Sequence, residues 1–452
     1  MNNTKQLKYD VAVIGGGPGG IPAAVAAARM GLKVILVERN AFLGGAAASG
    51  LGILGYIDRQ GNKALGGIAQ EIIDRLTEIG GATGHYQCPV HNSITPINPD
   101  LFKIVAVQMC TEAGVDILFN NELLEVMVDN GKIKKVATYG KCTRTEIEAE
   151  VFIDGTGDGD LAFMAGAAYI NGQDGTGIMQ PCTLMFTVSD YNMEEFLEYI
   201  KRCPDDFGIK EEYAEGYDLE FLKNTKGHCF IGLHNLISKA KDSGDFDVPR
   251  NQFIYITTPS DNLLAINTTR MININASDPF ELSNGLVEGY NQVMELLKFM
   301  RKYVPGFQNA NLSQISPSLG IRETRHFVGI DRLTVDKIYD AETYKNAIAL
   351  CAYNIDIHSG ISDHIDLTLI EKAFGIPYGC IVPKNIDGLL LSGRTISVDS
   401  NVYAATRVMG PCMAVGEAAG VAAGLSIEGK KQLAELDVAE IKSILLKNNA
   451  VL

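Results

Sequence analysis

Apolar and polar positions follow two different periods near the start of the chain. Residues 11–14 form a short unbroken apolar run, which is typical of a buried parallel strand. Residues 23–30 then predict a helix with Pro22 in its first turn, and residues 33–37 supply a second apolar run that ends on Glu38. The pattern predicts a strand, a turn, a helix and a second strand in succession.

The alternation of strand and helix patterns continues and then becomes irregular. It predicts helices at 65–79 and 100–113, strands at 115–119 and 150–153, and a hairpin of 123–128 and 132–138 around Asn130-Gly131. From about residue 172 the predicted elements are helices at 193–202, 217–224 and 283–303 and strand-like runs at 252–258 and 262–270. Near residue 376 the chain returns to parallel-strand composition, with "IDGLLLSGRTIS" as strand and turn and a helix at 409–425.

This return predicts one discontinuous domain. We expect an α/β fold in which residues 1–171 and 376–452 form a Rossmann-like nucleotide-binding domain with a parallel sheet, helices and a small antiparallel β-meander. Residues 172–375 form an inserted α+β substrate domain, a usual domain size.

Composition narrows the function classes. The chain has 452 residues, 46% of them hydrophobic, and a formal net charge of −15, which argues against a general nucleic-acid-binding surface but leaves room for a local cationic pocket. No signal core or apolar run of about eighteen residues is evident, so we expect a cytoplasmic protein without a membrane span. The cysteines are odd in number, scattered and without a CxxC pair, which predicts reduced thiols and no metal site. They are Cys88, Cys110, Cys142, Cys182, Cys203, Cys229, Cys351, Cys380 and Cys412.

The glycines after the first strand have the GxGxxG spacing of a dinucleotide-binding turn. Gly15 allows the tight turn, Gly17 lets the backbone approach a pyrophosphate, and Gly20 lets the helix pack close to the strand. The N–H groups and the positive end of the helix attract phosphates, and Glu38 can accept hydrogen bonds from a ribose. The unit suits NAD and FAD equally, and a glycine-rich turn without a ligand is the alternative.

Segments at both ends of the chain carry a family resemblance. The pair "VAVIGGGPGGIPAAVAAARMGLKVILVER" and "LLLSGRTISVDSNVYAATRVMGPCMAVGEAAGVAAG" resembles the FAD-dependent oxidoreductases of the glutathione-reductase-type FAD fold and, more distantly, the flavoproteins of fumarate reductase and succinate dehydrogenase. The segments "FLGGAAASG", "FIDGTGDGDLA", "GIRETRHFVG", "NIDIHSG" and "IPYGCIVPKNIDGLLLSGR" resemble that family in the same order. The resemblance implies FAD as the cofactor, and the lack of a histidine in "GGAAASGLGILGY" implies that it is bound noncovalently.

The resemblance also implies which residues hold the cofactor. The pyrophosphate would lie against Gly15, Gly17, Pro18, Gly19 and Gly20, and the adenosine against Glu38, Arg39 and the main chain of Leu123. Further backbone turns beside the nucleotide and the flavin are Gly44, Gly45, Thr156, Gly157, Asp158, Gly393 and Arg394. The last helix would direct its N-terminus at the flavin and contribute Arg407, Gly410 and Met413.

The catalytic candidates share one expectation, a position beside the flavin. They are His358, Asp356, Arg407, Arg322 and Tyr378, with Arg325, His326 and Tyr403 as further candidates. His358 can move a proton while the flavin moves a hydride, with Asp356 orienting its imidazole. The arginines can hold a carboxylate or carbonyl oxygen, and the tyrosines can stack on a ligand. The alternative for each is structural, as a buried hydrogen-bonded pair, an ion pair or a packed ring.

These features favour an FAD-dependent dehydrogenase or reductase that transfers a hydride between FAD and a small organic substrate. A flavin-dependent oxidase or monooxygenase is one alternative, although "SGR" replaces the Gly-Asp pair of aromatic hydroxylases. A non-catalytic FAD-binding electron-transfer subunit is another. No second GxGxxG unit is evident, so electrons exchange with substrates in one site or with an external carrier. The sequence leaves monomer and oligomer open.

Overall fold

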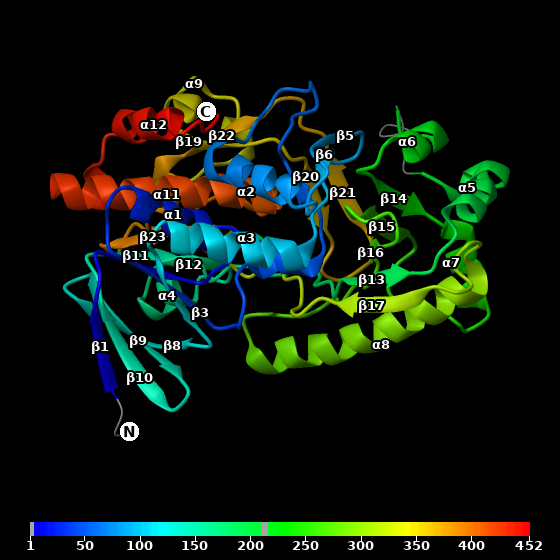
Figure 1. Ribbon diagram of the computed structural model, residues 1–452, viewed down its shortest axis with the longest axis horizontal. Helices are drawn as coiled ribbons and strands as arrows, with labels where there is room; N and C mark the ends of the chain where they lie inside the picture. The colour runs from blue at the N-terminus through cyan, green and yellow to red at the C-terminus, as the bar shows by residue number, and fades with distance from the viewer. Residues whose placement is uncertain (1–3, 209–215) are drawn as a thin grey trace.

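The central layer is a parallel sheet of strand order β23-β11-β2-β3-β7 (Figure 1). The computed structural model describes residues 4–208 and 216–452. Residues 1–3 of the predicted nucleotide-binding domain and 209–215 of the predicted insertion lie outside the described residues. The strands are β2 (Val11–Ile14), β3 (Val34–Glu38), β7 (Asp116–Phe119), β11 (Val151–Asp154) and β23 (Leu389–Leu391). The predicted α/β fold is confirmed, because a strand from the C-terminal segment completes a sheet begun at the N-terminus.

The sheet buries its middle strands completely, which explains their unbroken apolar runs. In β2, Val13 is in register with Ile153 of β11 on one side and Leu36 of β3 on the other. All residues of β2, β3, β11 and β23 are buried. The carboxyl ends of these strands therefore meet at one edge, where α/β folds place their ligands.

Two helices from opposite ends of the chain pack closely beside this sheet. They are α1 (Gly20–Arg29) and α11 (Met409–Gly429). A Cβ atom on Gly416 would overlap the carbonyl oxygen of Gly19, and one on Gly420 would overlap that of Ala23. Glycine is therefore required at these points, because the two backbones approach too closely for a side chain.

Helix α11 is longer than the predicted 409–425. Among the described residues it is the one helix apolar and long enough to cross a membrane by composition, with a mean hydropathy of 1.3, and 83% of that window is buried inside the protein. Glu417 interrupts its apolar residues, so the helix is not an unbroken apolar run, and the expectation of no membrane span stays a prediction. Its apolar composition is explained by its packing against α1, because a core helix needs no polar face.

A second sheet of order β1-β10-β9-β8 extends the predicted hairpin. The hairpin strands are confirmed as β8 (Glu122–Asp129) and β9 (Lys132–Gly140), with β10 (Thr143–Glu148) antiparallel to β9. The N-terminal β1 (Thr4–Lys8) adds in parallel to β10. The sequence did not predict β1 or β10, since their polar compositions "TKQLK" and "TRTEIE" lack an apolar run.

The inserted segment is built on an antiparallel sheet of order β14-β15-β16-β13-β17. Its strands are β13 (Phe186–Ser189), β14 (Cys229–Gly232), β15 (Phe253–Thr257), β16 (Leu264–Ile266) and β17 (Asn311–Ile315). Alternate residues of β15 point to opposite faces: Phe253 and Tyr255 join a hydrophobic core of the insertion, whereas Ile254 and Ile256 join the core of the nucleotide-binding fold. The sheet thus presents one apolar face toward the rest of the protein.

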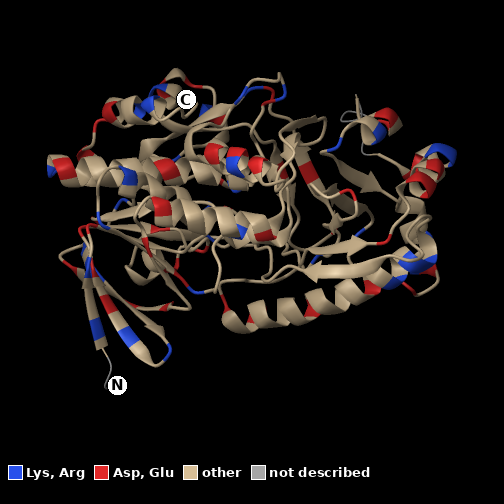
Figure 2. Ribbon diagram, in the orientation of Figure 1, with Lys and Arg blue, Asp and Glu red and all other residues tan. Residues whose placement is uncertain are grey.

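Helix α8 (Pro279–Tyr303) runs along the insertion (Figure 1). It begins four residues before the predicted 283, because Asp278 accepts hydrogen bonds from the N–H groups of Phe280 and Glu281 and caps it. The domain boundaries at 171/172 and 375/376 stay predictions. Figure 2 shows Lys and Arg spread over many elements, with α11 mostly uncharged.

The remaining elements connect these layers. The helices are α2 (Gly67–Glu78), α3 (Pro99–Glu112), α4 (Asp160–Met164), α5 (Met193–Arg202), α6 (Leu219–Asn224), α7 (His234–Asp242), α9 (Ala341–Lys345), α10 (Ser400–Thr406) and α12 (Val438–Lys447). The short strands are β4 (Ile53–Leu54), β5 (Tyr86–Cys88), β6 (Asn92–Thr95), β12 (Tyr169–Asn171), β18 (Arg325–Phe327), β19 (Ala347–Cys351), β20 (Ile355–His358), β21 (Ile365–Thr368) and β22 (Phe374–Pro377).

Candidate active site

The glycine turn after β2 has the geometry of a cradle. Gly15 has a φ of +98°, and a Cβ atom there or on Gly20 would overlap neighbouring backbone. A Cβ atom on Gly17, by contrast, would meet no described atom closer than 3.9 Å. Gly15 and Gly20 are thus required by the fold, whereas the open side of Gly17 leaves room for a ligand to approach the backbone.

A second glycine pair lies against the first. Gly44 and Gly45 have φ values of +126° and +49°, and the N–H of Gly44 donates to the carbonyl of Gly16 over 2.8 Å. A Cβ atom on Gly45 would come within 3.0 Å of the Cα of Gly17. The structure therefore brings together two turns that the sequence separates by more than twenty residues.

Glu38, at the end of β3, braces the glycine turn. Its carboxylate accepts hydrogen bonds from the N–H of Gly16 and from the N–H and side-chain amide of Asn40, each over 2.7 Å. Arg39 is exposed, and Leu123 lies in β8 opposite Thr138. The carboxylate of Glu38 thus holds the glycine turn in place, and the expected contact with a ribose would be a second role.

The turns after β11 and β23 meet through a buried ion pair. Arg394 Nη2 donates to Asp158 Oδ1 over 2.6 Å, and Thr324 Oγ1 donates to the same oxygen over 2.9 Å. Arg394 Nε and Ser392 Oγ are buried without a hydrogen-bond partner among the described residues. A Cβ atom on Gly393 would meet nothing within 4 Å.

These observations fit a pyrophosphate-bearing cofactor. Buried donors require acceptors, and phosphate or ribityl oxygens at the carboxyl edge of the sheet would supply them to Arg394 Nε and Ser392 Oγ. The open sides of Gly17 and Gly393 leave the space that such a group needs. The residues present therefore fit FAD.

The start of α11 forms the next wall of the site. Val408 is its N-cap residue, and a Cβ atom on Gly410 would overlap the carbonyl oxygen of Leu54. Met413 is fully buried in the core, away from the cavity described below. The positive end of this 21-residue helix is thus held at the site, where it can stabilise negative charge on a flavin.

A cavity of about 250 Å³ lies between this wall and the insertion. Arg394, Arg407 and Met409 line it from the nucleotide-binding fold, and Ile254 and Ile256 of β15 line it from the inserted sheet. Most of its remaining lining is apolar. The cavity therefore joins the two parts of the chain at the carboxyl edge of the parallel sheet.

His358 and Asp356, both on β20, line this cavity. His358 Nε2 lies 3.1 Å from Asp356 Oδ2, and the Tyr353 hydroxyl donates to the same oxygen over 3.0 Å. Arg270 Nη1 lies 3.3 Å from His358 Nδ1. Because a guanidinium only donates, Nδ1 is the acceptor, which assigns the ring proton to Nε2, where it is donated to Asp356.

The pKa values of both side chains lie below their ordinary values, which leaves one side chain neutral and the other ionised. Burial lowers the pKa of His358 to about 3, although Asp356 opposes the shift, so the imidazole is neutral. Burial alone would raise the pKa of Asp356, but His358 and then Arg407 hold it well below its usual range, so the carboxylate is ionised. The pair is therefore a neutral imidazole beside a fixed negative charge.

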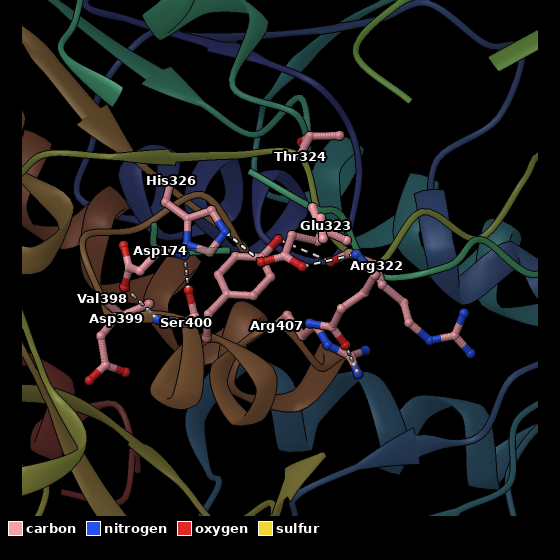
Figure 3. A network of polar contacts seen from close by, with 12 residues as sticks. Asp174, Arg322, Glu323, Thr324, His326, Val398, Asp399, Ser400 and Arg407 are labelled. Carbon is pink, nitrogen blue, oxygen red and sulfur yellow. Dashed lines mark hydrogen bonds and ion pairs between the residues drawn. The ribbon is translucent and has the colours of Figure 1, made fainter. Parts of the chain in front are cut away.

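Arg322 and Arg407 line the cavity together with this pair. Figure 3 shows the two arginines next to the polar network of Glu323 and His326. Arg322 Nη1 donates to the carbonyl of Pro181 over 2.6 Å and to Thr183 Oγ1 over 2.7 Å. Burial lowers the pKa of Arg322 to about 10, with Arg407 adding to the shift. Arg407 Nη2 donates to the carbonyl of Asp356 over 3.1 Å.

Gln180 links the cavity to a buried polar network. Its Oε1 accepts from the N–H of His358 over 3.2 Å and from Arg407 over 3.4 Å, while its N–H donates to Glu323 over 3.0 Å. Glu323 lies 2.9 Å from His326 Nε2 (Figure 3). His326 stacks on Tyr403 at 3.9 Å between ring centroids, so both support the site without lining the cavity.

Two sequence candidates lie elsewhere. The hydroxyl of Tyr378 donates to the carbonyl of Leu433 over 2.8 Å, and the ring does not line the cavity. Arg325 pairs with Asp160 over 2.9 Å and also lies outside the cavity lining. The structure therefore does not bring Tyr378 together with His358.

Sequence reasoning also missed cavity residues. Arg250 and Tyr353 line the cavity, and Arg270 contacts His358 from behind it. Arg250 and Arg270 lie just before and just after the β15–β16 strand pair. A basic residue beside an apolar run is a weak signal of a functional site in the sequence. Their role depends on packing between distant segments.

Two curated proteins of known function resemble parts of this chain. The chain is 28% identical over 253 residues to digeranylgeranylglycerophospholipid reductase of Methanoculleus marisnigri, over 54% of this chain and 61% of that protein. It is 30% identical over 139 residues to thiamine thiazole synthase of Aeropyrum pernix, over 29% of this chain and 44% of that protein. The matches thus span less than two thirds of these relatives' own lengths.

A solved structure and a family model extend the comparison along the chain. A geranylgeranyl bacteriochlorophyll reductase-like protein from Thermoplasma acidophilum aligns with 98% of this chain and 84% of its own, at a TM-score of 0.48 and 15% identity. The family model described as FAD dependent oxidoreductase matches residues 10–445. This protein therefore belongs to the FAD-dependent oxidoreductase family, and is an enzyme whose cofactor is FAD.

Proposed function

We propose that this enzyme is a dehydrogenase or reductase that transfers a hydride between noncovalently bound FAD and a small organic substrate. The observation that carries the proposal is the cavity that joins the start of α11 and Arg394 to the His358–Asp356 pair. Bound FAD supplies the hydride acceptor or donor. A mostly apolar space beside it suits a reaction in which little water meets the flavin.

His358 is the group proposed to move the proton. Its Nδ1 carries no proton and meets Arg270 over 3.3 Å, so this nitrogen is the proposed acceptor for the proton of a substrate hydroxyl that approaches beside Arg270. Asp356 holds the other ring nitrogen and stabilises the imidazolium that results. The reverse transfer, from the same nitrogen to substrate, serves reduction.

The arginines on the cavity wall are proposed to orient the substrate. Arg322 and Arg407 are both half-buried and line the cavity with the imidazole. Planar guanidinium groups can hold a carboxylate or carbonyl oxygen in a fixed direction. The reacting carbon would thereby be kept near the flavin during hydride transfer.

The test is anaerobic screening of metabolites for bleaching or recolouring of the bound flavin. Once a substrate is found, His358→Gln should retain FAD but slow flavin reduction by about 10²- to 10⁴-fold, the usual contribution of general acid–base catalysis. His364→Gln is the matched control, because that histidine is exposed and pairs with Asp366 on the surface. Unchanged reduction in His358→Gln would remove this residue from the proton step.

The other outcomes of the screen separate the alternatives. A flavin that no metabolite oxidises or reduces indicates an electron-transfer subunit. Oxygen consumption with hydrogen peroxide or a hydroxylated product indicates an oxidase or monooxygenase.

A further inference from the structure

The cavity carries an excess of buried positive charge. Four guanidinium groups gather around it, those of Arg250, Arg270, Arg322 and Arg407, and each of them lowers the pKa of a neighbour in the cluster. Asp356 is the one carboxylate that lines the cavity among the described residues. In a chain of formal net charge −15, this local concentration of cations requires an explanation.

Arg250 is the least compensated of the four. It is 1% exposed, and its two hydrogen bonds are long, from Nε to the carbonyl of Thr268 over 3.3 Å and from Nη2 to the carbonyl of Asn267 over 3.5 Å. No carboxylate of the described residues forms an ion pair with it. A guanidinium buried in this way destabilises a protein unless an anion approaches it.

Arg322 shares this state, whereas Arg270 does not. Within the described part of the chain, the side chain of Arg322 donates hydrogen bonds to the neutral oxygens of Pro181 and Thr183 and to no carboxylate. Arg270 donates instead to the carbonyl oxygens of residues 359, 362 and 364 and is held by that loop. Arg250 and Arg322 are therefore wall residues with donors left for a ligand; among the described residues Arg407 Nε is also without a partner, and Arg394 Nε is the donor matched above to the cofactor.

The acids near the cluster do not neutralise it. Asp356 already accepts hydrogen bonds from Tyr353 and His358 and lies 3.7 Å from Arg407. Asp363 attracts Arg250 and Arg270 from the loop before β21, but it is exposed to solvent. Solvent weakens that attraction, so the wall facing the cavity stays positive.

The inward face of the inserted sheet supplies an apolar part of the wall. Ile231 of β14 and Ile254 and Ile256 of β15 line the cavity there, with the polar side chains of Thr183, Gln252 and Asn267 elsewhere in the lining. The three isoleucines favour hydrocarbon and offer no hydrogen bonds to a ligand. The ligand chemistry that matches both walls is an anion joined to an apolar body.

We propose that the substrate of this site is an organic acid whose carboxylate or phosphate lies between Arg250 and Arg322, with its apolar body against Ile231, Ile254 and Ile256. That this acid is the substrate rests on the proposed function, whereas the binding of the acid at this site does not. Arg250 is the specificity-determining residue, because it recognises the anion without contacting the reacting pair His358 and Asp356.

The first experiment compares ligands of one body and different heads. Hexanoate, hexyl phosphate and hexanol are titrated into the oxidised, FAD-loaded protein, and binding is measured by calorimetry and by the flavin difference spectrum. Hydrogen bonds to charged groups predict that the preferred acid binds about 10- to 100-fold more tightly than hexanol. The two acids distinguish a carboxylate site from a phosphate site. Hexanol binding as tightly as both acids overturns the proposal.

The second experiment removes the anion-binding group. Arg250→Met keeps an unbranched apolar stem and removes the guanidinium and its charge, so binding of the preferred acid should fall at least about 10-fold while hexanol binding is unchanged. Without ligand, this variant should melt at a temperature no lower than the wild type, because an uncompensated buried charge is gone. A purely structural arginine gives the opposite result, a lower melting temperature with unchanged acid binding, and that result overturns the proposal.

Two further variants keep the test decisive. Arg301→Met is the matched control, because Arg301 lies on α8 and contacts Ala310 and Asn311 away from the cavity. If Arg250→Met does not load FAD, Arg250→Lys keeps the charge but loses the guanidinium fork, and should bind the acid more weakly than wild type. Equal acid affinity in Arg250→Lys and wild type then counts against the proposal.

Failure of this inference is distinguishable from failure of the proposed function, because binding is measured without turnover. Acids that bind to a flavin that no metabolite reduces support the anion site and contradict the dehydrogenase or reductase. A flavin reduced by a neutral metabolite, in a protein that binds neither acid, does the reverse.

Discussion

Glu417 on α11 offers a prediction whose size follows from its burial. Its side chain is almost fully buried, one carboxylate oxygen accepts a hydrogen bond from the N–H of Ile68 over 2.8 Å, and the other has no partner among the described residues. Burial raises the pKa of Glu417 to about 7 from the ordinary 4.5. The change that tests this is Glu417→Gln, which keeps the shape and removes the titration.

The magnitude follows from the difference between the two pKa values. Between pH 4.5 and about 7 the folded protein holds a proton on Glu417 that the unfolded chain has released, so stability falls as the pH rises through this window. At about 1.4 kcal/mol for each pKa unit, ionising Glu417 in the folded protein costs about 3 kcal/mol above pH 7. Glu417→Gln avoids this cost and should be more stable than wild type at pH 8, but not at pH 4.5.

The assay is the melting temperature with saturating FAD at several pH values between 4.5 and 8. With an unfolding entropy of about 2.1 cal/mol/K per residue, each kcal/mol shifts the melting temperature of a chain this long by about 1 °C. The variant should therefore gain about 3 °C at pH 8 relative to its difference at pH 4.5. Glu428→Gln, on an exposed position of the same helix, is the control. A difference between Glu417→Gln and wild type that does not change with pH refutes the reasoning.

Three further predictions concern the cofactor and a residue outside the cavity. Gly17→Ala should fold with wild-type stability, since its Cβ atom meets no described atom closer than 3.9 Å, yet bind FAD at least about 10-fold more weakly in equilibrium titration; equal FAD affinity would place the pyrophosphate elsewhere. Arg394→Lys should also weaken FAD binding by about 10-fold, because lysine keeps the charge beside Asp158 but has no Nε donor; unchanged affinity would show that Nε meets no cofactor oxygen. Tyr378→Phe should lower the free energy of unfolding by about 1 kcal/mol through loss of the bond to Leu433, with flavin reduction unaffected; slower reduction would return Tyr378 to the site.

Much of the nucleotide-binding fold could be predicted because its signals are local. An apolar run, a glycine turn and an alanine-rich helix each reflect the conformations of adjacent residues, and the structure has β2 and α1 at these positions. Strands β1 and β10 could not be predicted in this way. Their polar sequences are strands because they pair with each other in parallel at the edge of a sheet.

In the candidate site, too, local features could be predicted from the sequence, whereas positions that depend on packing could not. The sequence placed His358 and Asp356 on one strand, and the structure has both on β20 lining the cavity. Whether they act in catalysis stays a prediction. Tyr378 has the same local appearance of a candidate, but the packing of α11 and its following segment directs its hydroxyl to Leu433 instead.

The sequence by itself determined the class of fold, because a glycine turn between an apolar strand and a helix is a local pattern. The turn left NAD and FAD open, and the resemblance of both ends of the chain to FAD-dependent oxidoreductases implied FAD. Only the tertiary structure decided which charges surround the substrate cavity. Arg250, Arg322 and Arg407 are far apart in sequence, and each resembles an ordinary basic residue in its own segment. The folded chain brings these guanidinium groups together around one cavity. A guanidinium removed from water must be compensated by a partner, and residues adjacent in the sequence do not supply one.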